Sequence, residues 1–245
     1  MKTKKNKIIV ITGGSGRFGK ILRKIEAPYK ILYPSKKDLN LDNYINIKKY
    51  LKKIKPNYLI HMGGLSRPLA IHEKNISKSI DLNIIGTSNI TKVCSENNIK
   101  LIYFSTHYVY PGLKGNYKEN DAIKPYNNYA WSKLGGECAV NMLKNSLILR
   151  ICMTEKPFIH KKAFADVKLN YLFHNEFAEI LFKLIDERGI LNIGGNKRTV
   201  YSFAKEHNDK VEKIFAKTVF GKKYPIKQDM NLKNLKKIIK KYEKK

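Results

Sequence analysis

Up to Glu155 the chain alternates short apolar runs with longer stretches in which apolar residues recur at helical spacing. A short apolar run is typical of a buried strand, and the longer period is typical of a helix with one buried face. The expected strands are Lys7–Thr12, Tyr29–Tyr33, Tyr58–Met62, Ile99–Ser105 and Leu147–Ile151. The expected helices are Lys20–Ile25, Asp42–Ile54, Ile71–Glu96 and Tyr129–Lys144. Strands that alternate with helices predict an α/β protein with a doubly wound parallel sheet.

After Glu155 the pattern is less regular. It predicts a helix over Glu176–Asp186, a strand over Ile190–Ile193 and a short helix over Tyr201–His207. From Asn231 onward apolar residues at helical spacing are separated by lysines, which favours an amphipathic helix docked on the body over a membrane-surface helix. We therefore expect two regions, 1–155 and 156–245. The second is a smaller lobe that includes the C-terminal helix and packs as one unit with the first.

A glycine-rich turn follows the first expected strand directly. Gly14, Gly16 and Gly19 match the pattern G-x-G-x-x-G, with an apolar strand before it and a helix after it. In this context the glycines allow a tight turn and a close approach of the backbone to a pyrophosphate, which the first N–H groups of the helix bind. The turn therefore predicts a Rossmann dinucleotide site. The alternative is a glycine-rich turn that binds no ligand.

The end of the second strand bears on which dinucleotide would bind. An acidic residue there accepts hydrogen bonds from the ribose 2′-hydroxyl, whereas basic and hydroxyl side chains suit a 2′-phosphate. No acid stands immediately after Tyr33, and Ser35 with Lys36 could hold a phosphate. The sequence therefore favours NADP. NAD stays an alternative, because lysine is so common in this chain that Lys36 could stand at this position by chance.

Tyr129 and Lys133 form a Y-x-x-x-K pair on an expected helix. Residues at this spacing share a helix face, and a nearby ammonium favours the phenolate, so the tyrosine could exchange a proton during catalysis. The pattern alone is common by chance, but this helix follows a strand that ends in Ser105-Thr106. A hydroxyl at the carboxyl end of a strand lies where open α/β sheets bind ligands. These groups together predict a site that holds and protonates a carbonyl oxygen.

These segments resemble the extended short-chain dehydrogenases/reductases, and most closely their dTDP-4-dehydrorhamnose reductase-like branch. The resemblance is carried by Thr12–Gly19 (TGGSGRFG), Ser105–Gly112 (STHYVYPG) and Tyr129–Lys133 (YAWSK). It extends to Asp81–Thr87 (DLNIIGT), Tyr117–Asp121 (YKEND), Pro125 and Gly136-Glu137. It implies that residues 1–155 are an NAD(P)-binding Rossmann domain with the catalytic residues, and that residues 156–245 are a reduced substrate lobe.

The resemblance also implies a role for each matching residue. Tyr129 would protonate the keto oxygen, Lys133 would lower the pKa of Tyr129 and bind ribose, and Thr106 would hydrogen-bond the carbonyl. Asn83 would help to organise the catalytic helix and its proton relay. His107 stands at the position of the branch's aspartate and could contact the substrate with Thr106 and Tyr129. The implied cofactor-binding residues are Gly13, Gly14, Ser15, Gly16, Arg17, Phe18, Gly19, Ser35, Lys36, Asn40, Leu41, Met62, Gly63, Gly64 and Lys133, and no metal is expected.

The activity that the resemblance implies is NAD(P)-dependent reduction of a nucleotide-linked 4-keto-6-deoxy sugar, in surface polysaccharide precursor synthesis. Related dehydratases need two carboxylates where this chain has His107 and Tyr108, and related epimerase-reductases need a cysteine at the position of Tyr108. Two alternatives stay open. One is an NAD-dependent nucleotide-sugar epimerase, and the other is a non-catalytic cofactor-binding regulatory subunit on the same fold.

The formal net charge is +29, and nearly all of the 49 basic residues are lysines spread along the chain. Base-reading proteins prefer arginine, so we expect no specific nucleic-acid partner. No apolar run approaches the ~20 residues that cross a bilayer, and the basic residues 1–7 lack the features of a signal peptide. Cys94, Cys138 and Cys152 form no CxxC pair. We expect a cytoplasmic protein with a nucleotide-sugar substrate and no membrane partner, and its oligomeric state, including a homodimer, stays open.

Overall fold

The structure is a computed structural model that describes residues 6–243. Residues 1–5, on which much of the expectation about a signal peptide rests, lie outside the described residues. The described chain forms two compact units. The first holds the chain up to Ser105 with Asn127–Leu149 and Ile185–Ile190, and the second holds Thr106–Tyr126, Arg150–Leu184 and the chain from Leu191 onward. The domain boundary expected near Glu155 stays a prediction.

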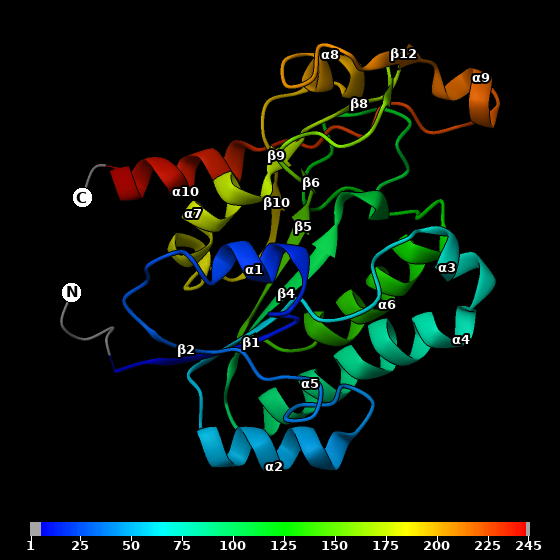
Figure 1. The fold of residues 1–245 in the computed structure, drawn as a ribbon. Coiled ribbons are helices and arrows are strands. Elements are labelled where there is room, and N and C mark those ends of the chain that lie inside the picture. The colour runs from blue at the N-terminus through cyan, green and yellow to red at the C-terminus, as the bar shows by residue number, and fades with distance from the viewer. Residues whose placement is uncertain (1–5, 244–245) are drawn as a thin grey trace. The chain divides into compact units, whose positions relative to one another are not determined.

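A six-stranded sheet in the order β10-β5-β4-β3-β1-β2 organises the described chain (Figure 1). Its strands are β1 (Ile8–Thr12), β2 (Lys30–Leu32), β3 (Tyr58–His61), β4 (Lys100–Thr106), β5 (Ser146–Ile151) and β10 (Gly189–Ile193). The pairs β1–β2, β1–β3 and β3–β4 are parallel. Because β2 and β3 lie on opposite sides of β1, the winding of the chain reverses there, and open α/β sheets bind ligands at such a point. The predicted Rossmann-like α/β fold is confirmed.

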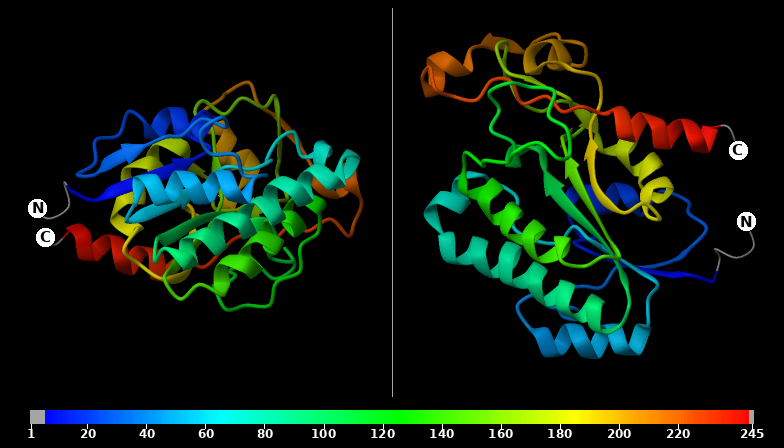
Figure 2. Two further views of the ribbon diagram at one scale, coloured as in Figure 1. Left: turned by 90° about the horizontal axis from the view of Figure 1, so that it is seen from below. Right: turned by 180° about the vertical axis from the view of Figure 1, so that it is seen from behind.

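Helices of the first unit cover both faces of the sheet. They are α1 (Arg17–Leu22), α2 (Tyr44–Ile54), α3 (Ala70–Lys74), α4 (Ile76–Ser79), η1 (Ile80–Ile85), α5 (Gly86–Glu96) and α6 (Asn128–Asn141). Figures 1 and 2 show α2, α5 and α6 along one face and α1 over the other. On the first face, Ile47, Leu51 and Ile90 pack in one buried cluster with Leu59 and Leu101 of the central strands. Strands that are buried on both faces are apolar throughout, which is why short apolar runs located them.

The single long helix predicted over Ile71–Glu96 is wrong. The chain forms α3, breaks at Asn75, and continues as α4, the π-helical turn η1 and then α5. The Asn75 side chain accepts a hydrogen bond from the Lys78 amide at 2.9 Å, and this cap begins a new helix. Turns of π-helix are frequent at functional sites, and this one carries the buried Asn83. Apolar periodicity reports which face is buried and is insensitive to such breaks.

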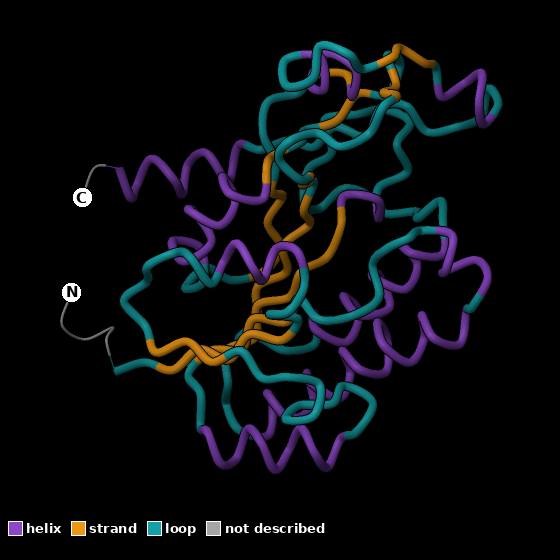
Figure 3. Tube along the Cα trace, in the orientation of Figure 1, coloured by secondary structure: helices purple, strands orange, loops and turns teal. Residues whose placement is uncertain are grey.

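The second unit consists of short paired strands and helices (Figure 3). Its further strands are β6 (Met153–Thr154), β7 (Lys162–Phe164), β8 (Lys168–Leu169), β9 (Leu172–Phe173), β11 (Arg198–Thr199) and β12 (Glu212–Ile214). Its helices are η2 (His107–Val109), α7 (His174–Leu184), α8 (Val200–Lys205), α9 (Ala216–Phe220) and α10 (Lys233–Glu243). Helix α10 packs against α7 and buries Leu235, which fits the docked amphipathic helix expected there. Within residues 6–243, none of the helices has the length and apolar character needed to cross a bilayer.

Candidate active site

Close backbone packing holds the glycine turn between β1 and α1. Gly13 has a φ of +75°, and a Cβ there would lie 2.8 Å from the amide nitrogen of Gly63. A Cβ at Gly19 would lie 2.6 Å from the carbonyl carbon of Gly14. The Gly16 amide donates to the carbonyl oxygen of Gly13 at 3.0 Å and closes the turn. The structure therefore brings the glycine turn together with the loop that follows β3, two segments predicted to surround a cofactor.

Arg23 and Tyr33, which the sequence patterns did not single out, support this turn. The Arg23 Nε donates to the carbonyl oxygen of Gly14 at 3.1 Å. Its guanidinium lies over the Tyr33 ring, 4.2 Å from the ring centroid. A Cβ at Gly14 would lie 2.5 Å from the Tyr33 Cδ1, so this ring packs directly on the turn. No short motif marks these two residues, because Arg23 contacts Gly14, 9 residues before it, and Tyr33, 10 residues after it.

Ser35 and Lys36, predicted to hold a 2′-phosphate, are engaged with acids of their own loop. The Ser35 hydroxyl and amide both donate to the Asp38 carboxylate, at 2.7 and 3.0 Å. Lys36 forms an ion pair with Asp42 at 3.5 Å, and its side chain is 76% exposed. A bound 2′-phosphate would therefore have to compete with two carboxylates for these groups.

The N-terminal half of α6 carries Tyr129 and Lys133. Helix α3 contacts the first turn of α6 and holds it in place. The Asn128 amide donates to the Glu73 carboxylate at 3.1 Å, and the Asn128 side chain donates to it at 2.6 Å. The His72 ring, also from α3, lies with its centroid 5.1 Å from that of Tyr129. The segment after β3 therefore positions the predicted catalytic tyrosine, and neither Glu73 nor His72 was identified from the sequence.

Asn83, in the π-helical turn, joins the loop after β3 to α6. Its side-chain nitrogen donates to the Leu65 carbonyl and to the Ser132 hydroxyl, both at 2.8 Å. Its side-chain oxygen accepts a hydrogen bond from the Leu65 amide at 2.8 Å. The Ser132 hydroxyl donates in turn to the Tyr129 carbonyl at 2.8 Å. The geometry thus places Asn83 where it can hold the catalytic helix, and its role in a proton relay stays a prediction.

Lys133 is buried against the sheet, with its Nζ 4.2 Å from the centroid of the Tyr103 ring. Burial lowers the pKa of Lys133 to about 7, and the negative charge of Glu137, one helical turn further on, opposes that fall. Glu137 is also buried and accepts a hydrogen bond from the Ser105 hydroxyl. Lys133 therefore changes its charge close to neutral pH, where it can influence the proton on Tyr129.

Thr106 and His107 belong to the second unit, at the end of β4 and the start of η2. The Thr106 hydroxyl accepts a hydrogen bond from the Tyr108 amide at 3.3 Å. The His107 Nδ1 lies 3.2 Å from the carbonyl oxygen of Ile151, so Nδ1 carries a hydrogen and donates it. Burial lowers the pKa of His107 to about 4, against the opposing effect of the hydrogen bond with the Ile151 carbonyl. The ring is therefore neutral at pH 7, unlike the aspartate of the reductase branch.

Two of the predicted cofactor residues, Asn40 and Leu41, are tied to helices. The Asn40 amide donates to the Asn46 side chain of α2 at 2.7 Å. The Leu41 carbonyl accepts a hydrogen bond from Asn89 of α5 at 3.1 Å. Their predicted place beside an adenine stays a prediction. Within residues 6–243 no group of three His, Cys, Asp or Glu side chains could hold a metal ion.

The sheet order and the glycine turn at the reversal of winding, with Tyr129 and Lys133 on one helix, define the class of this protein. It is a Rossmann-fold protein of the extended short-chain dehydrogenase/reductase type. The model of the family described as RmlD substrate binding domain matches residues 6–172. The chain belongs to this family, which confirms the resemblance stated from the sequence.

Individual relatives match parts of this chain. The dTDP-4-dehydrorhamnose reductase of Aggregatibacter actinomycetemcomitans is 26% identical over 190 residues, 76% of this chain and 59% of the relative. The methionine adenosyltransferase 2 subunit beta of Xenopus laevis is 30% identical over 140 residues, 54% of this chain and 42% of the relative. The chain thus spans about half the length of the curated relatives that it matches. A crystal structure of the Bacillus anthracis dTDP-4-dehydrorhamnose reductase in complex with NADP shares the fold, with a TM-score of 0.84, 24% identity and coverage of 94% and 92% of the two chains.

Gly13→Ala is expected to lower the free energy of unfolding more than Gly189→Ala does. Both glycines have a positive φ, +75° and +81°, but a Cβ at Gly189 meets nothing within 4 Å. The control should therefore lose only the ~1–2 kcal/mol of a left-handed alanine. Gly13→Ala should lose a further ~1–3 kcal/mol from overlap with Gly63. Urea unfolding measures both, and equal losses would show that contact with Gly63 does not constrain the turn.

Glu137→Gln is expected to move the pKa of Lys133 below about 7. The substitution removes the charge that stabilises the ammonium and keeps an acceptor for Ser105. A 13Cε NMR titration, assigned with Lys133→Arg, should show the midpoint at lower pH. The control is Glu96→Gln, because Glu96 pairs with Lys48 at 3.0 Å and is partly exposed. It should leave the Lys133 midpoint in place, and an unchanged midpoint in Glu137→Gln would show that Glu137 does not support the charge.

Proposed function

We propose that this chain is an NADPH-dependent reductase of a nucleotide-linked 4-keto-6-deoxy sugar. The observation that carries the proposal is the environment of α6, where Tyr129 and the buried Lys133 share a helix that Asn83 and Glu73 hold in place. A module that only binds a dinucleotide has no need of a tyrosine–lysine pair with such support. The similarity to the dTDP-4-dehydrorhamnose reductase of A. actinomycetemcomitans supports the class of substrate.

Tyr129 would give its phenolic proton to the keto oxygen as the carbonyl carbon is reduced. Thr106 would donate a hydrogen bond to the same oxygen, as the family resemblance implies. The Lys133 ammonium would favour the phenolate that remains on Tyr129, because an opposite charge nearby stabilises the ionised form. A positioned general acid of this kind contributes ~10²–10⁴-fold to the rate.

The glycine turn fits a dinucleotide. A Cβ at Gly16 would meet only the carbonyl oxygen of Gly13 within 4 Å, at 3.2 Å, so side chains leave this part of the turn open. No side chain caps α1, and its first amides would hold the pyrophosphate. Lys133 would bind the ribose, and NADPH, when bound, would supply the hydride. The choice of NADP is supported by Ser35 and Lys36 after β2 and by the NADP complex of the B. anthracis reductase.

The product would serve as a precursor for surface polysaccharide, as the family resemblance implies. We place the reaction in the cytoplasm. The free thiols of Cys94, Cys138 and Cys152 support a reducing compartment.

A second candidate function is a cofactor-binding regulatory subunit without turnover. The similarity to the X. laevis methionine adenosyltransferase 2 subunit beta supports it. The neutral His107 supports it too, because this ring does not supply the charge of the reductase branch's aspartate. In this case the dinucleotide would bind at the same glycine turn, and substitution of Tyr129 would be without consequence.

Tyr129→Phe is expected to lower kcat for reduction of a nucleotide-linked 4-keto sugar by ~10²–10⁴-fold, because the proton donor is lost. The dissociation constant for NADPH should stay within about twofold, because the phenol contributes to no part of the predicted cofactor site. NADPH oxidation and fluorescence titration measure the two quantities. Tyr44→Phe is the control, since the Tyr44 hydroxyl donates to Glu96. Cofactor binding without NADPH oxidation on any such sugar would favour the regulatory function.

Purified protein is expected to bind NADPH more tightly than NADH. Lys36→Ala should reduce this preference by up to about fivefold, since an exposed ion pair contributes ~1 kcal/mol or less. Lys37→Ala is the matched control, as the neighbouring lysine of the same loop. Equal affinity for the two cofactors, or a preference for NADH, would contradict the choice of NADP.

A further inference from the structure

The side chain of Arg23 turns back from the end of α1 toward the glycine turn. Arg23 is the C-cap residue of this helix, and its Nε donates to the carbonyl oxygen of Gly14 at 3.1 Å. Side chains of a helix lean toward its N-terminus, which is the direction of this contact. The guanidinium carbon lies 4.2 Å from the centroid of the Tyr33 ring. All three residues belong to the first unit.

Tyr33 stands at the point where a Rossmann site distinguishes its two dinucleotides. It directly follows β2, which pairs in parallel with β1, the strand that leads into the glycine turn. A Cβ at Gly14 would lie 2.5 Å from the Tyr33 Cδ1, so the ring packs against that turn. An acid near this point accepts hydrogen bonds from the 2′-hydroxyl of NAD, and an arginine accommodates the 2′-phosphate of NADP. No acid stands at Tyr33 or in the four residues after it, and the Tyr33 ring carries an arginine instead.

Most of the guanidinium is left for a ligand. Among residues 6–243, the side chain of Arg23 makes one hydrogen bond, from Nε, and no ion pair. An arginine has five N–H donors, so the four on the terminal nitrogens remain for a ligand. Arg23 is also exposed, which lets a ligand reach it from solvent. A guanidinium can meet a phosphate with two parallel hydrogen bonds, and this geometry suits the free terminal nitrogens.

The two residues predicted from the sequence to hold this phosphate lie beside negative charge. Ser35 donates twice to Asp38, and these hydrogen bonds lower the pKa of the Asp38 carboxyl, which is therefore ionised at pH 7. Lys36 is paired with Asp42. A phosphate held there would approach both carboxylates. Arg23 instead lies over an aromatic ring, whose face attracts a cation and has no net charge.

We propose that Arg23 binds the 2′-phosphate of NADPH and sets the preference for NADPH over NADH, with Tyr33 as the residue that positions its guanidinium. This inference deepens the proposed function and rests on its choice of NADPH. It does not depend on which substrate is reduced.

The contacts of Arg23 order its side chain before a ligand binds. The Nε is tied to the backbone of Gly14, and the ring of Tyr33 supports the guanidinium. An arginine that is already held in place loses less conformational freedom on binding than a free lysine such as the 76% exposed Lys36. The bond to Gly14 also ties the guanidinium to the turn that would hold the pyrophosphate of the same molecule.

The ratio of the dissociation constants for NADH and NADPH tests the role of Arg23. Both cofactors contain the pyrophosphate, so general damage to the glycine turn cancels in this ratio. Arg23→Ala should lower the ratio by about ten- to a hundredfold, the effect of losing hydrogen bonds to a charged group. Lys36→Ala should lower it by no more than about fivefold. Fluorescence titration measures both constants.

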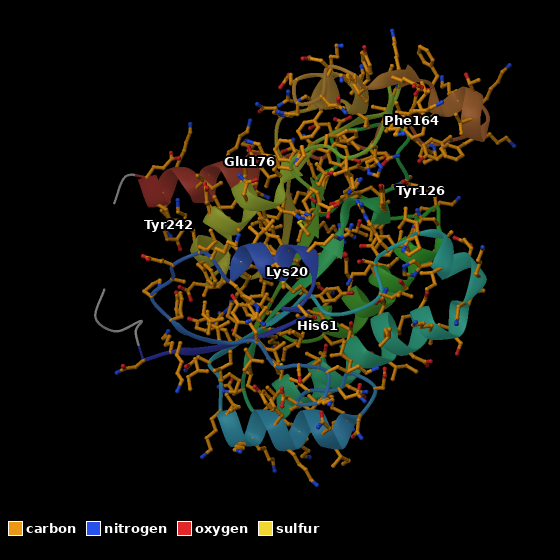
Figure 4. All side chains as sticks on the ribbon, in the orientation of Figure 1. Lys20, His61, Tyr126, Phe164, Glu176 and Tyr242 are labelled. Carbon is orange, nitrogen blue, oxygen red and sulfur yellow. The ribbon has the colours of Figure 1, made fainter. Side chains whose placement is uncertain are left out.

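Lys20→Ala is the matched control, because it removes one positive charge from the same helix. Lys20 is exposed and is labelled on α1 in Figure 4. It should leave the ratio within about twofold, since an isolated surface charge contributes little at physiological salt. An equal loss in Lys20→Ala and Arg23→Ala would show that the preference reflects net charge alone, and would refute the proposal.

The positioning role of Tyr33 is tested by two substitutions of the ring. Tyr33→Leu removes the aromatic face and should lower the ratio by about two- to fivefold, the effect of an exposed cation–π contact. Tyr33→Phe keeps that face and should keep the preference. Arg23→Lys retains the charge but loses the planar fork and the Nε bond, so it should recover only part of what Arg23→Ala loses. Full recovery in Arg23→Lys would contradict the part played by Gly14 and Tyr33.

A smaller ligand pair removes the nicotinamide from the comparison. Adenosine 2′,5′-bisphosphate should bind the unsubstituted protein more tightly than adenosine 5′-monophosphate, and Arg23→Ala should remove most of this difference. If Arg23→Ala weakens NADPH and NADH equally, Arg23 only supports the turn and the proposal fails. A preference of the unsubstituted protein for NADH would overturn it as well. Failure to reduce any sugar would contradict the proposed function alone, because every measurement here is of binding without a substrate.

Discussion

The parallel pairing of β1 with β3 is the constraint on which the site depends. It places Thr12 opposite His61 at the carboxyl ends of the two strands. The chain leaves both strands in the same direction, so the glycine turn and the Met62–Gly64 loop pack on each other, with a hypothetical Cβ at Gly13 only 2.8 Å from the Gly63 amide nitrogen. Without this register the Met62–Gly64 loop would not pack against the glycine turn and would not fix the conformation of that turn. The hydrogen bond between the Thr12 hydroxyl and the His61 imidazole also stabilises this register.

Burial of polar groups is the second organising feature, and it is notable in a chain with a net charge of +29. Most lysines lie in water, where their charge costs little. Lys133 is instead buried, with its Nζ 4.2 Å from the centroid of the Tyr103 ring. Its pKa falls to about 7 because burial outweighs the stabilising charge of Glu137. His61 and Asn83 are buried without charge, with both imidazole nitrogens and every side-chain atom of the amide in hydrogen bonds. Buried groups with complete sets of partners stiffen a site, because moving any one of them leaves another unsatisfied.

The fold and the outline of the site could be predicted because each depends on local patterns. Apolar runs located the five N-terminal strands of the sheet, and the glycine turn and the Tyr129–Lys133 pair are short motifs that identify themselves by spacing. The breaks in the helix predicted over Ile71–Glu96 could not be found this way. Apolar spacing continues across Asn75 and through the π-helical turn, while the cap at Asn75 and the contacts of Asn83 are what end the regular helix.

The residues that support the site could not be predicted from the sequence either, because their contacts are not local. Arg23 reaches Gly14, Glu73 reaches Asn128, and Tyr103 reaches Lys133 across separations that no local motif spans. The sequence by itself determined the α/β architecture, the glycine turn and the pair of residues proposed for acid chemistry, because backbone propensity and spacing are local properties. Only the tertiary structure decided the lowered pKa of the buried Lys133 and the neutral state of the buried His61. Both depend on desolvation and on hydrogen-bond partners, which exist only when strands and helices that are distant in the chain are packed together.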